Sequence, residues 1–159
     1  PGSFALVVAG LLAALAEGQP LAGADDWWLL TSLILFVGLG GMIGSVARYK
    51  AGGWLLHQTL LEKFPYSTFA VNVAGCLAAG VLAGLVEKHD LFAADTRLFL
   101  FTGLLGGFTT FSAFGLDAIY LVRRGELMTA ASYAGLSVIV GIAAVWLGFR
   151  LVASWPSPG

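Results

Sequence analysis

The sequence predicts an all-α integral membrane protein with four transmembrane helices. Of its 159 residues, 58% are hydrophobic and only 11% are charged, and the mean hydropathy is +0.89. A soluble domain carries about 25% charged residues, so this chain has too few of them to cover a surface that faces water. The charged residues also gather in short stretches. The uncharged runs between those stretches approach the ~20 residues that a helix needs to cross a bilayer.

The four uncharged runs cover residues 27–47, 65–86, 98–116 and 127–149. We expect the first helix to open at the aromatic pair Trp27-Trp28, which suits the headgroup layer, and to close at 48–50. Residues 51–65 contain paired glycines and end in a proline, so they predict a surface loop with room for one amphipathic turn. The remaining helices are expected near 66–86, 96–122 and 127–153, with a polar loop at 87–95.

The four helices would form one domain at 27–153, between an extension at 1–26 and a tail at 154–159. The apolar segment 4–16 of the extension is too short for an ordinary span. We expect it to be a short helix at the membrane surface or packed on the protein. The alternatives are a remnant of a signal peptide and, less favoured, a fifth crossing. We expect the extension to be dispensable.

The distribution of basic residues says little about orientation. With four spans, both termini and the 87–95 loop would share one side of the membrane. That side carries three Lys or Arg residues and the other carries five, which is a weak bias. A chain with so weak a bias can insert in both orientations, and this would permit an antiparallel homodimer.

Several functions are excluded by simple chemistry. The net charge of −1 argues against a nucleic-acid surface, which would need a basic stripe. Cys76 is the only cysteine, so an intrachain disulfide cannot form, and we expect the thiol to be a small core residue. His57 and His89 lack the spacing of metal ligands, so we expect them to be solvated loop residues.

Residues 103–114 (GLLGGFTTFSAF) are the most informative segment. Two adjacent glycines followed by two threonines make a poor helix interior, because each glycine costs roughly 1 kcal/mol relative to alanine. In lipid, a broken helix frees carbonyls and amides that must find partners. The segment therefore predicts a break in the third helix near Gly106-Gly107, at an ion site or a cavity. A glycine-rich packing face with back-bonding threonines is the alternative that the segment leaves open.

Polar side chains occur inside two other spans. Asn72 lies within the second helix, where an amide usually faces protein or water. Tyr133, Ser137 and Gly141 follow at a spacing of four in the last helix, which places two hydroxyls on one stripe. Each of these groups could also make an ordinary hydrogen bond between helices.

Phe111 and Phe114 lie three residues apart and so share one helix face. Taken alone, they would be core or lipid-facing aromatics. The central stretches contain no carboxylate, lysine or histidine for proton transfer or amine binding. Neutral donors and aromatic edges suit a small anion better than a cation.

Three segments carry a family resemblance, namely residues 40–49 (GGMIGSVARY), 68–75 (TFAVNVAG) and 106–114 (GGFTTFSAF). In order and spacing they resemble the signature segments of the Fluc (CrcB-type) fluoride ion channels, and the third is the most specific. The resemblance covers about residues 30–153. It implies a dual-topology homodimer of antiparallel subunits with two separate pores, which lets fluoride leave passively across the cell (inner) membrane.

The resemblance also implies roles for single residues. The fluoride pore would be lined by Phe111, Phe114, Asn72, Tyr133, Ser137 and Thr110. The two phenylalanines would turn the positive edges of their rings toward fluoride. Asn72 would be the pore asparagine, and the hydroxyls of Tyr133 and Ser137 would form a polar track on the last helix.

A structural Na⁺ is implied at the dimer interface, held by the main-chain carbonyls of Gly106 and Thr109 from both subunits. Arg48 matches an arginine of the first helix, for which we expect a structural or electrostatic role at the vestibule. Gly141 and Asp117 depart from the family pattern. Gly141 stands where many members place a further hydroxyl, which would make that end of the track wetter or less selective.

Asp117 stands near the implied pore mouth, where a glutamate is usual, so we assign it to the vestibule. The other interpretation is an interfacial carboxylate that faces Arg123 or Arg124.

Rival functions fit the sequence less well. A small drug/proton antiporter needs a carboxylate in its first helix, and residues 27–47 contain none. A membrane subunit without transport activity would not explain phenylalanine, threonine and asparagine at mid-membrane depth. An enzyme is not expected, because no nucleophile–base set or metal cluster is visible.

Overall fold

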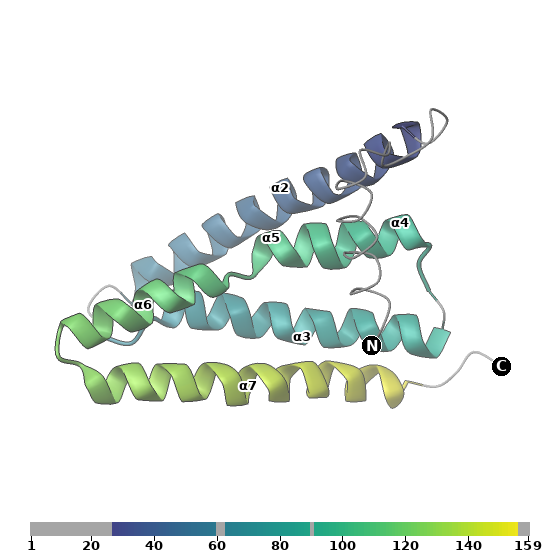
Figure 1. The fold of residues 1–159 in the computed structure, drawn as a ribbon. Helices are drawn as coiled ribbons and strands as arrows, with labels where there is room; N and C mark the ends of the chain where they lie inside the picture. The colour runs from purple at the N-terminus through teal and green to yellow at the C-terminus, as the bar shows by residue number, and fades with distance from the viewer. Residues whose placement is uncertain (1–26, 60–62, 90, 156–159) are drawn as a thin grey trace, which may run out of the picture. The chain divides into compact units, whose positions relative to one another are not determined.

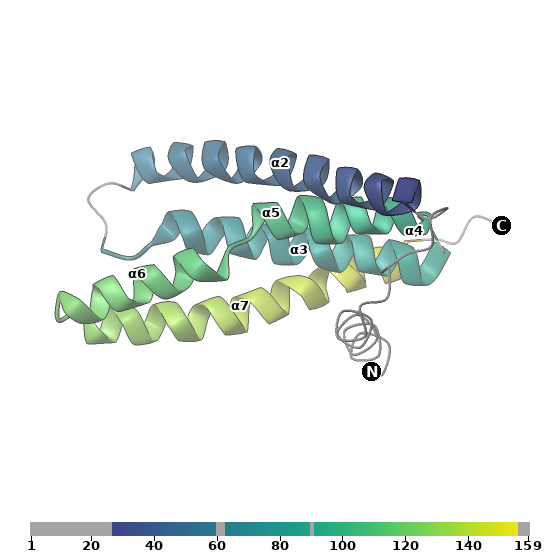
Figure 2. The same cartoon turned by 45° about the horizontal axis from the view of Figure 1, so that its top comes forward.

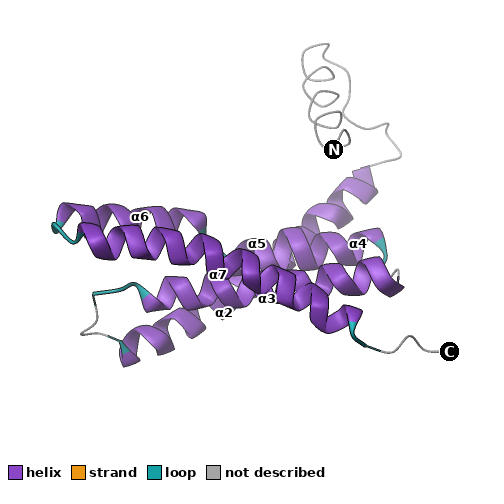
Figure 3. Cartoon of the chain, turned by 90° about the horizontal axis from the view of Figure 1, so that it is seen from below, coloured by secondary structure: helices purple, strands orange, loops and turns teal. Residues whose placement is uncertain are grey.

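The computed structural model describes residues 27–59, 63–89 and 91–155, and in these residues all regular structure is helical (Figure 3). The elements are α2 (Trp27–Gln58), α3 (Tyr66–His89), α4 (Ala94–Arg97), the π-helix η1 (Leu98–Leu105), α5 (Gly106–Phe108), α6 (Phe111–Arg123) and α7 (Leu127–Ala153). Four described stretches are long and apolar enough to cross a membrane: Thr31–His57, Tyr66–His89, Ala94–Arg123 and Leu127–Ala153. The prediction of an all-helical protein with four spans is therefore confirmed.

The contacts divide the chain into two units, residues 1–35 and 36–159, which we describe separately. The described part of the first unit, residues 27–35, forms the opening turns of α2. The second unit holds the rest of α2 and all the other helices. The predicted extension at 1–26 lies outside the described residues, as do residues 156–159 of the tail.

The loop predicted at 51–65 is wrong for its first half, because α2 continues to Gln58. Each of its two glycines costs a helix roughly 1 kcal/mol, but good helix formers flank them on both sides and offset that cost. The hydroxyl of Ser67 donates to the carbonyl of Gly52 at 2.9 Å, which ties this part of α2 to the first turn of α3. The last helix was predicted at 127–153 and has these bounds.

Helices α3 and α7 run side by side along their length (Figure 1). Glycines let their backbones approach closely, as small residues do where helices meet in lipid. A Cβ built on Gly80 would lie 2.1 Å from the carbonyl oxygen of Val145, and one built on Gly148 would lie 2.5 Å from that of Leu77. The two helices therefore touch backbone to backbone at both positions.

Replacing Gly80 by Ala is expected to prevent normal packing of α3 on α7. The new methyl would meet the main-chain oxygen of Val145, which cannot move aside as a side-chain end could. We expect a loss of about 1–3 kcal/mol or more, visible as a lower yield of monodisperse protein and a lower thermal midpoint in detergent. Gly135→Ala on α7 is the control, since nothing lies within 4 Å of its Cβ. Equal stability of the two variants would contradict this account.

The glycines of the first signature segment serve a second close contact. A Cβ on Gly44 would lie 2.1 Å from the carbonyl oxygen of Leu104, and one on Gly40 would lie 2.6 Å from that of Phe99. From the other side, a Cβ on Gly107 would lie 2.5 Å from the carbonyl oxygen of Gly41. Residues 40–44 of α2 thus pack directly on the backbone of η1 and α5.

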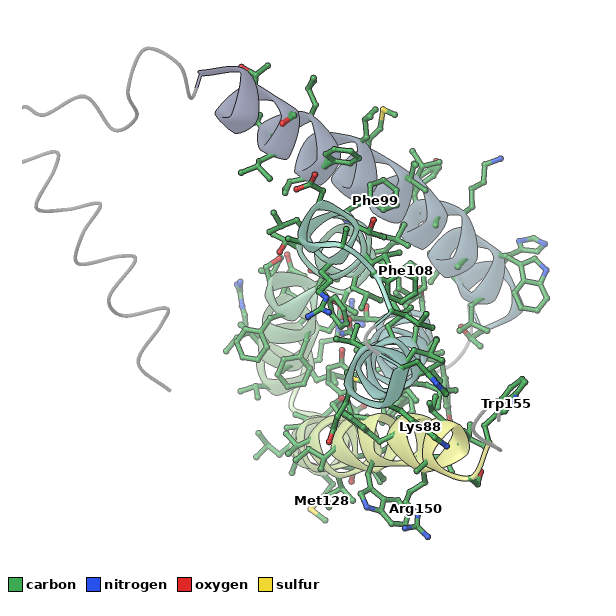
Figure 4. All side chains as sticks on the ribbon, turned by 90° about the vertical axis from the view of Figure 1, so that its right-hand side faces the viewer. Lys88, Phe99, Phe108, Met128, Arg150 and Trp155 are labelled. Atoms are coloured by element: carbon green, nitrogen blue, oxygen red, sulfur yellow. The ribbon has the colours of Figure 1, made fainter. Side chains whose placement is uncertain are left out.

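A lysine holds the carboxyl end of α7. The ammonium group of Lys88 donates to the carbonyls of Val152 at 3.3 Å and Ala153 at 3.1 Å, and also to that of Trp155. Lys88 and Trp155 lie on the same side of the pair formed by α3 and α7 (Figure 4). A cation here stabilises the helix end by meeting its unpaired carbonyls.

One buried cluster of the described residues is centred on an aromatic side chain. Tyr133 is fully buried and packs with the buried residues Leu121 and Ala130. Large apolar side chains such as Met128, which points away from the other helices in Figure 4, are exposed on the outer faces. Lipid accommodates such side chains, so their exposure is the normal condition of a membrane-spanning helix.

Candidate functional site

The backbone leaves helical geometry at Thr109 and Thr110, between α5 and α6 (Figure 2). Their φ/ψ angles are −86°/157° and −150°/117°, both in the extended region. Gly106 and Gly107, where we expected the interruption, are themselves helical, so it lies two residues further along. Threonine is β-branched and favours extended backbone, which accounts for the position.

Asn72 of α3 takes the place of main-chain partners at this interruption. The main-chain N–H of Thr110 donates to its Oδ1 at 2.8 Å, and its Nδ2 donates to the carbonyl oxygen of Thr110 at 3.1 Å. Buried backbone groups require such partners, and the amide supplies both kinds. One N–H of the Asn72 amide is used in this way and the other remains.

The carbonyls of residues 106–109 lose their helical donors at the interruption. In a continuous helix the N–H of Thr110 would donate to Gly106 and that of Ala113 to Thr109. Instead, Thr110 donates to Asn72, and Ala113 donates to the hydroxyl of Thr110 at 3.3 Å. The carbonyls of Gly106 and Thr109 are thus among those that the interruption deprives of their regular partners.

Arg48 hydrogen-bonds to the carbonyl of Gly107, the residue after Gly106. Its Nε donates to the main-chain oxygen of Gly107 at 3.1 Å, which satisfies the end of α5. Arg48 also lines a cavity of about 250 Å³ that includes Ser67, Thr68 and Thr110. The side chain therefore combines a structural contact with a positive charge beside this cavity.

A cavity of about 290 Å³ lies against the interruption. Five of the six residues expected to line the pore surround it: Asn72, Thr110, Phe111, Phe114 and Ser137. They come from α3, the α5–α6 connection, α6 and α7. We call this hollow the Asn72 cavity. Tyr133, the sixth expected residue, is not among those that line it.

The two phenylalanine rings of α6 lie next to each other. Their centroids are 5.4 Å apart and their planes are tilted by 35°. Phe114 also packs on the ring of Tyr133 at 5.1 Å, whereas Phe111 is 84% exposed in the single chain. The Phe111 ring is therefore available to lipid or to a second copy.

Ser137 offers a hydroxyl to the Asn72 cavity. Its oxygen is buried and has no hydrogen-bond partner within the described chain. Buried polar atoms normally have a partner, so an unpaired one beside a cavity indicates that an occupant completes it.

Tyr133 contributes to a different part of the site. Its hydroxyl donates to Oδ2 of Asp117 at 3.4 Å, and its ring lies edge-on to Phe64 at 5.3 Å. Asp117 lines a further cavity of about 330 Å³, together with Lys63 and Arg124. The carboxylate therefore lines the same cavity as one basic residue before α3 and another just after α6.

Neighbouring cavities share lining residues. Thr110 lines both the Asn72 cavity and the cavity beside Arg48, while Ser67 and Thr68 of α3 line both the cavity beside Arg48 and the one beside Asp117. The cavities form a succession of hollows from Asp117 toward the interruption, each with polar side chains among its lining residues.

Sequence reasoning missed two residues that line the Asn72 cavity, Cys76 and Val138. Cys76 was expected in the core but is only partly buried and lines the Asn72 cavity. Its spacing of four from Asn72 was the available signal, because residues four apart share a helix face.

Comparison with known proteins assigns the family. The model of the CrcB-like proteins, Camphor Resistance (CrcB), matches residues 35–149. A relative from Methylobacillus flagellatus, named fluoride-specific ion channel FluC, is 50% identical over 119 residues, covering 75% of this chain and 93% of the relative. Proteins of the same name from Rhizobium etli and Acidobacterium capsulatum are 48% and 41% identical, over 74% and 75% of this chain and 94% and 98% of their own lengths. With its four membrane-spanning helices, the chain is a multi-pass membrane protein that belongs to the CrcB-like family.

Proposed function

We propose that the protein is a fluoride-selective ion channel, not an enzyme, through which F⁻ leaves passively across the cell (inner) membrane. The relatives that cover most of the chain are named as fluoride-specific channels. The observation that carries the proposal is the Asn72 cavity, where an amide, hydroxyls and two phenylalanine rings meet beside an interrupted helix.

The chemistry of this cavity suits fluoride. The ion holds its water strongly, so a pore must replace those hydrogen bonds. It must do so without a full positive charge that would trap the ion. The remaining N–H of Asn72 and the unpaired hydroxyl of Ser137 are neutral donors of this kind. The edges of Phe111 and Phe114 add weaker positive potential.

Purified protein in liposomes tests the function directly. Vesicles loaded with fluoride should release it to an external electrode once a potassium ionophore balances the charge. Protein-free vesicles and vesicles loaded with chloride are the controls. Release that required an opposing proton gradient would favour an antiporter, and the absence of release would contradict the proposal.

We further propose that the third helix is functionally broken at Thr109-Thr110 and that a structural Na⁺ lies there. The carbonyls of Gly106 and Thr109, which lose their helical donors, are the hard oxygen ligands that would hold the ion. When bound, Na⁺ would supply the positive partner that these oxygens need in a medium without water. The same two carbonyls from a second subunit would complete the cage.

Replacing Gly106 by Val is expected to abolish stabilisation by Na⁺. In the single chain a Cβ on Gly106 meets only the carbonyl oxygen of Phe101 at 3.8 Å, an ordinary contact, so Ala there is the matched control. We expect the thermal midpoint of wild type and Gly106→Ala to be higher in Na⁺ than in N-methylglucamine, and that of Gly106→Val to be the same in both. A Val variant that kept the full Na⁺ dependence would argue against a cation at these carbonyls.

The functional unit that we propose is an antiparallel homodimer with two pores. The weak bias of the basic residues and the exposed ring of Phe111 support it. In a Cys76→Ser background, a thiol introduced by Ser154→Cys marks the end of α7. An impermeant thiol reagent added to sealed vesicles should label about half of this thiol, because a weakly biased chain inserts both ways. Complete labelling or none would indicate a single orientation.

A further inference from the structure

Cys76 places a thiol in the Asn72 cavity. It follows Asn72 by one turn of α3, so both side chains lie on the same face. The cysteine is partly buried and lines the cavity with Asn72 and Ser137. None of the other lining residues is charged, so the thiol is the group in this hollow that can become a strong ligand.

The facing helix leaves room for the thiol. A Cβ built on Gly141 of α7 would lie 3.5 Å from Sγ of Cys76, an ordinary contact distance. Because glycine has no side chain, α7 presents only its backbone at this level. Ser137 lies one turn earlier on α7, on the same stripe as Gly141.

The hydroxyl of Ser137 is a second, independent indication of a ligand site. Its oxygen is buried, has no partner within the described chain and lines the same cavity as the thiol. A buried hydroxyl of this kind is completed by whatever occupies the cavity. The cavity thus offers one soft ligand, Sγ, and one unsatisfied oxygen.

We propose that Cys76 and Ser137 form a site within the ion path for a thiophilic cation such as Hg²⁺, and that its binding blocks the channel. The inference rests on the proposed function. On binding, the S–H bond breaks, an S–Hg bond forms, and the proton leaves to water without any change of oxidation state. Soft metals prefer thiolate ligands, so the metal selects Cys76 over the oxygens around it. The bound cation both fills the cavity and holds the fluoride that approaches it.

The test measures fluoride efflux from liposomes before and after addition of micromolar HgCl₂, with each protein compared to its own untreated rate. We expect the wild-type rate to fall by more than about tenfold, a barrier rise of about 1.4 kcal/mol, and to recover with excess dithiothreitol. Cys76→Ser should keep most of its own rate. The double variant Cys76→Ser, Ser154→Cys is the matched control, because its one thiol lies at the exposed end of α7 and should bind mercury without block.

Intact-protein mass spectrometry separates the possible outcomes. A mercury adduct on wild type, absent from Cys76→Ser, is expected whether or not the vesicles carry fluoride. No adduct would show that the thiol is out of reach and would overturn the inference while leaving the proposed function standing. An adduct with undiminished efflux would place Cys76 off the ion path and would also overturn it. An adduct on protein that shows no efflux before treatment would contradict the proposed function and, with it, the block.

Discussion

Replacing Asn72 by Asp is expected to lower fluoride flux by more than about a hundredfold, a barrier rise of ~2.7 kcal/mol. The carboxylate can still accept from the N–H of Thr110, as Oδ1 does now at 2.8 Å. Its second oxygen, however, would face the carbonyl of Thr110, where Nδ2 now donates at 3.1 Å. The same substitution removes the free N–H from the cavity and places negative charge where the anion must pass.

Asn72→Leu separates charge from positioning. Leucine is similar in size and neutral, but it breaks both bonds to Thr110. We expect Asn72→Leu to lose flux and Asn72→Asp to lose more, in liposomes containing equal amounts of folded dimer. Equal losses would assign Asn72 to positioning alone. An Asp variant with wild-type flux would show that the ion does not pass this amide.

The second large effect on fluoride flux is expected from replacing the phenylalanine rings of α6. Phe111→Ile or Phe114→Ile should each lower fluoride flux by more than roughly tenfold, a barrier rise of about 1.4 kcal/mol. Isoleucine keeps the position apolar but lacks the positive ring edge that attracts an anion. Flux is measured by the fluoride electrode, and the dimer is checked by size-exclusion chromatography.

The substitution at Phe111 separates the effect on flux from the effect on packing better than the one at Phe114. The Phe111 ring is 84% exposed in the single chain, so its loss should barely disturb the internal packing, whereas Phe114 supports the ring of Tyr133 at 5.1 Å. Phe36→Ile, at an exposed ring on α2, is the matched control and should leave flux unchanged. Unchanged flux at both α6 positions would mean that these rings only pack.

The helices could be predicted from the sequence because the charged residues delimit them. Uncharged runs of about 20 residues leave few alternatives in a bilayer, and the bounds of α7 were predicted to the residue. The loop at 51–65 failed because two glycines were given more weight than the good helix formers beside them, and α2 runs to Gln58. Local propensity is a weak prior that neighbouring residues override.

The site was predicted as a set of residues, but their contacts were not. Spacing along single helices and family motifs brought Asn72, Phe111, Phe114 and Ser137 onto one list, and they line one cavity. No pattern within one helix could show that Asn72 pairs with the backbone of Thr110, or that Tyr133 turns toward Asp117. Those contacts join separate helices and depend on how the helices pack.

The direct backbone contact at Gly80 and Gly148 fixes the position of α3 along the axis of α7. If either helix slid by one residue, a glycine would leave the contact and a neighbour with a Cβ would enter it. At these distances of 2.1 and 2.5 Å that Cβ would collide with a main-chain oxygen. In a bilayer, apolar side chains alone cannot favour one register over another, since lipid tails are as apolar as these side chains. The glycines therefore determine a single register for two helices whose apolar surfaces are otherwise alike.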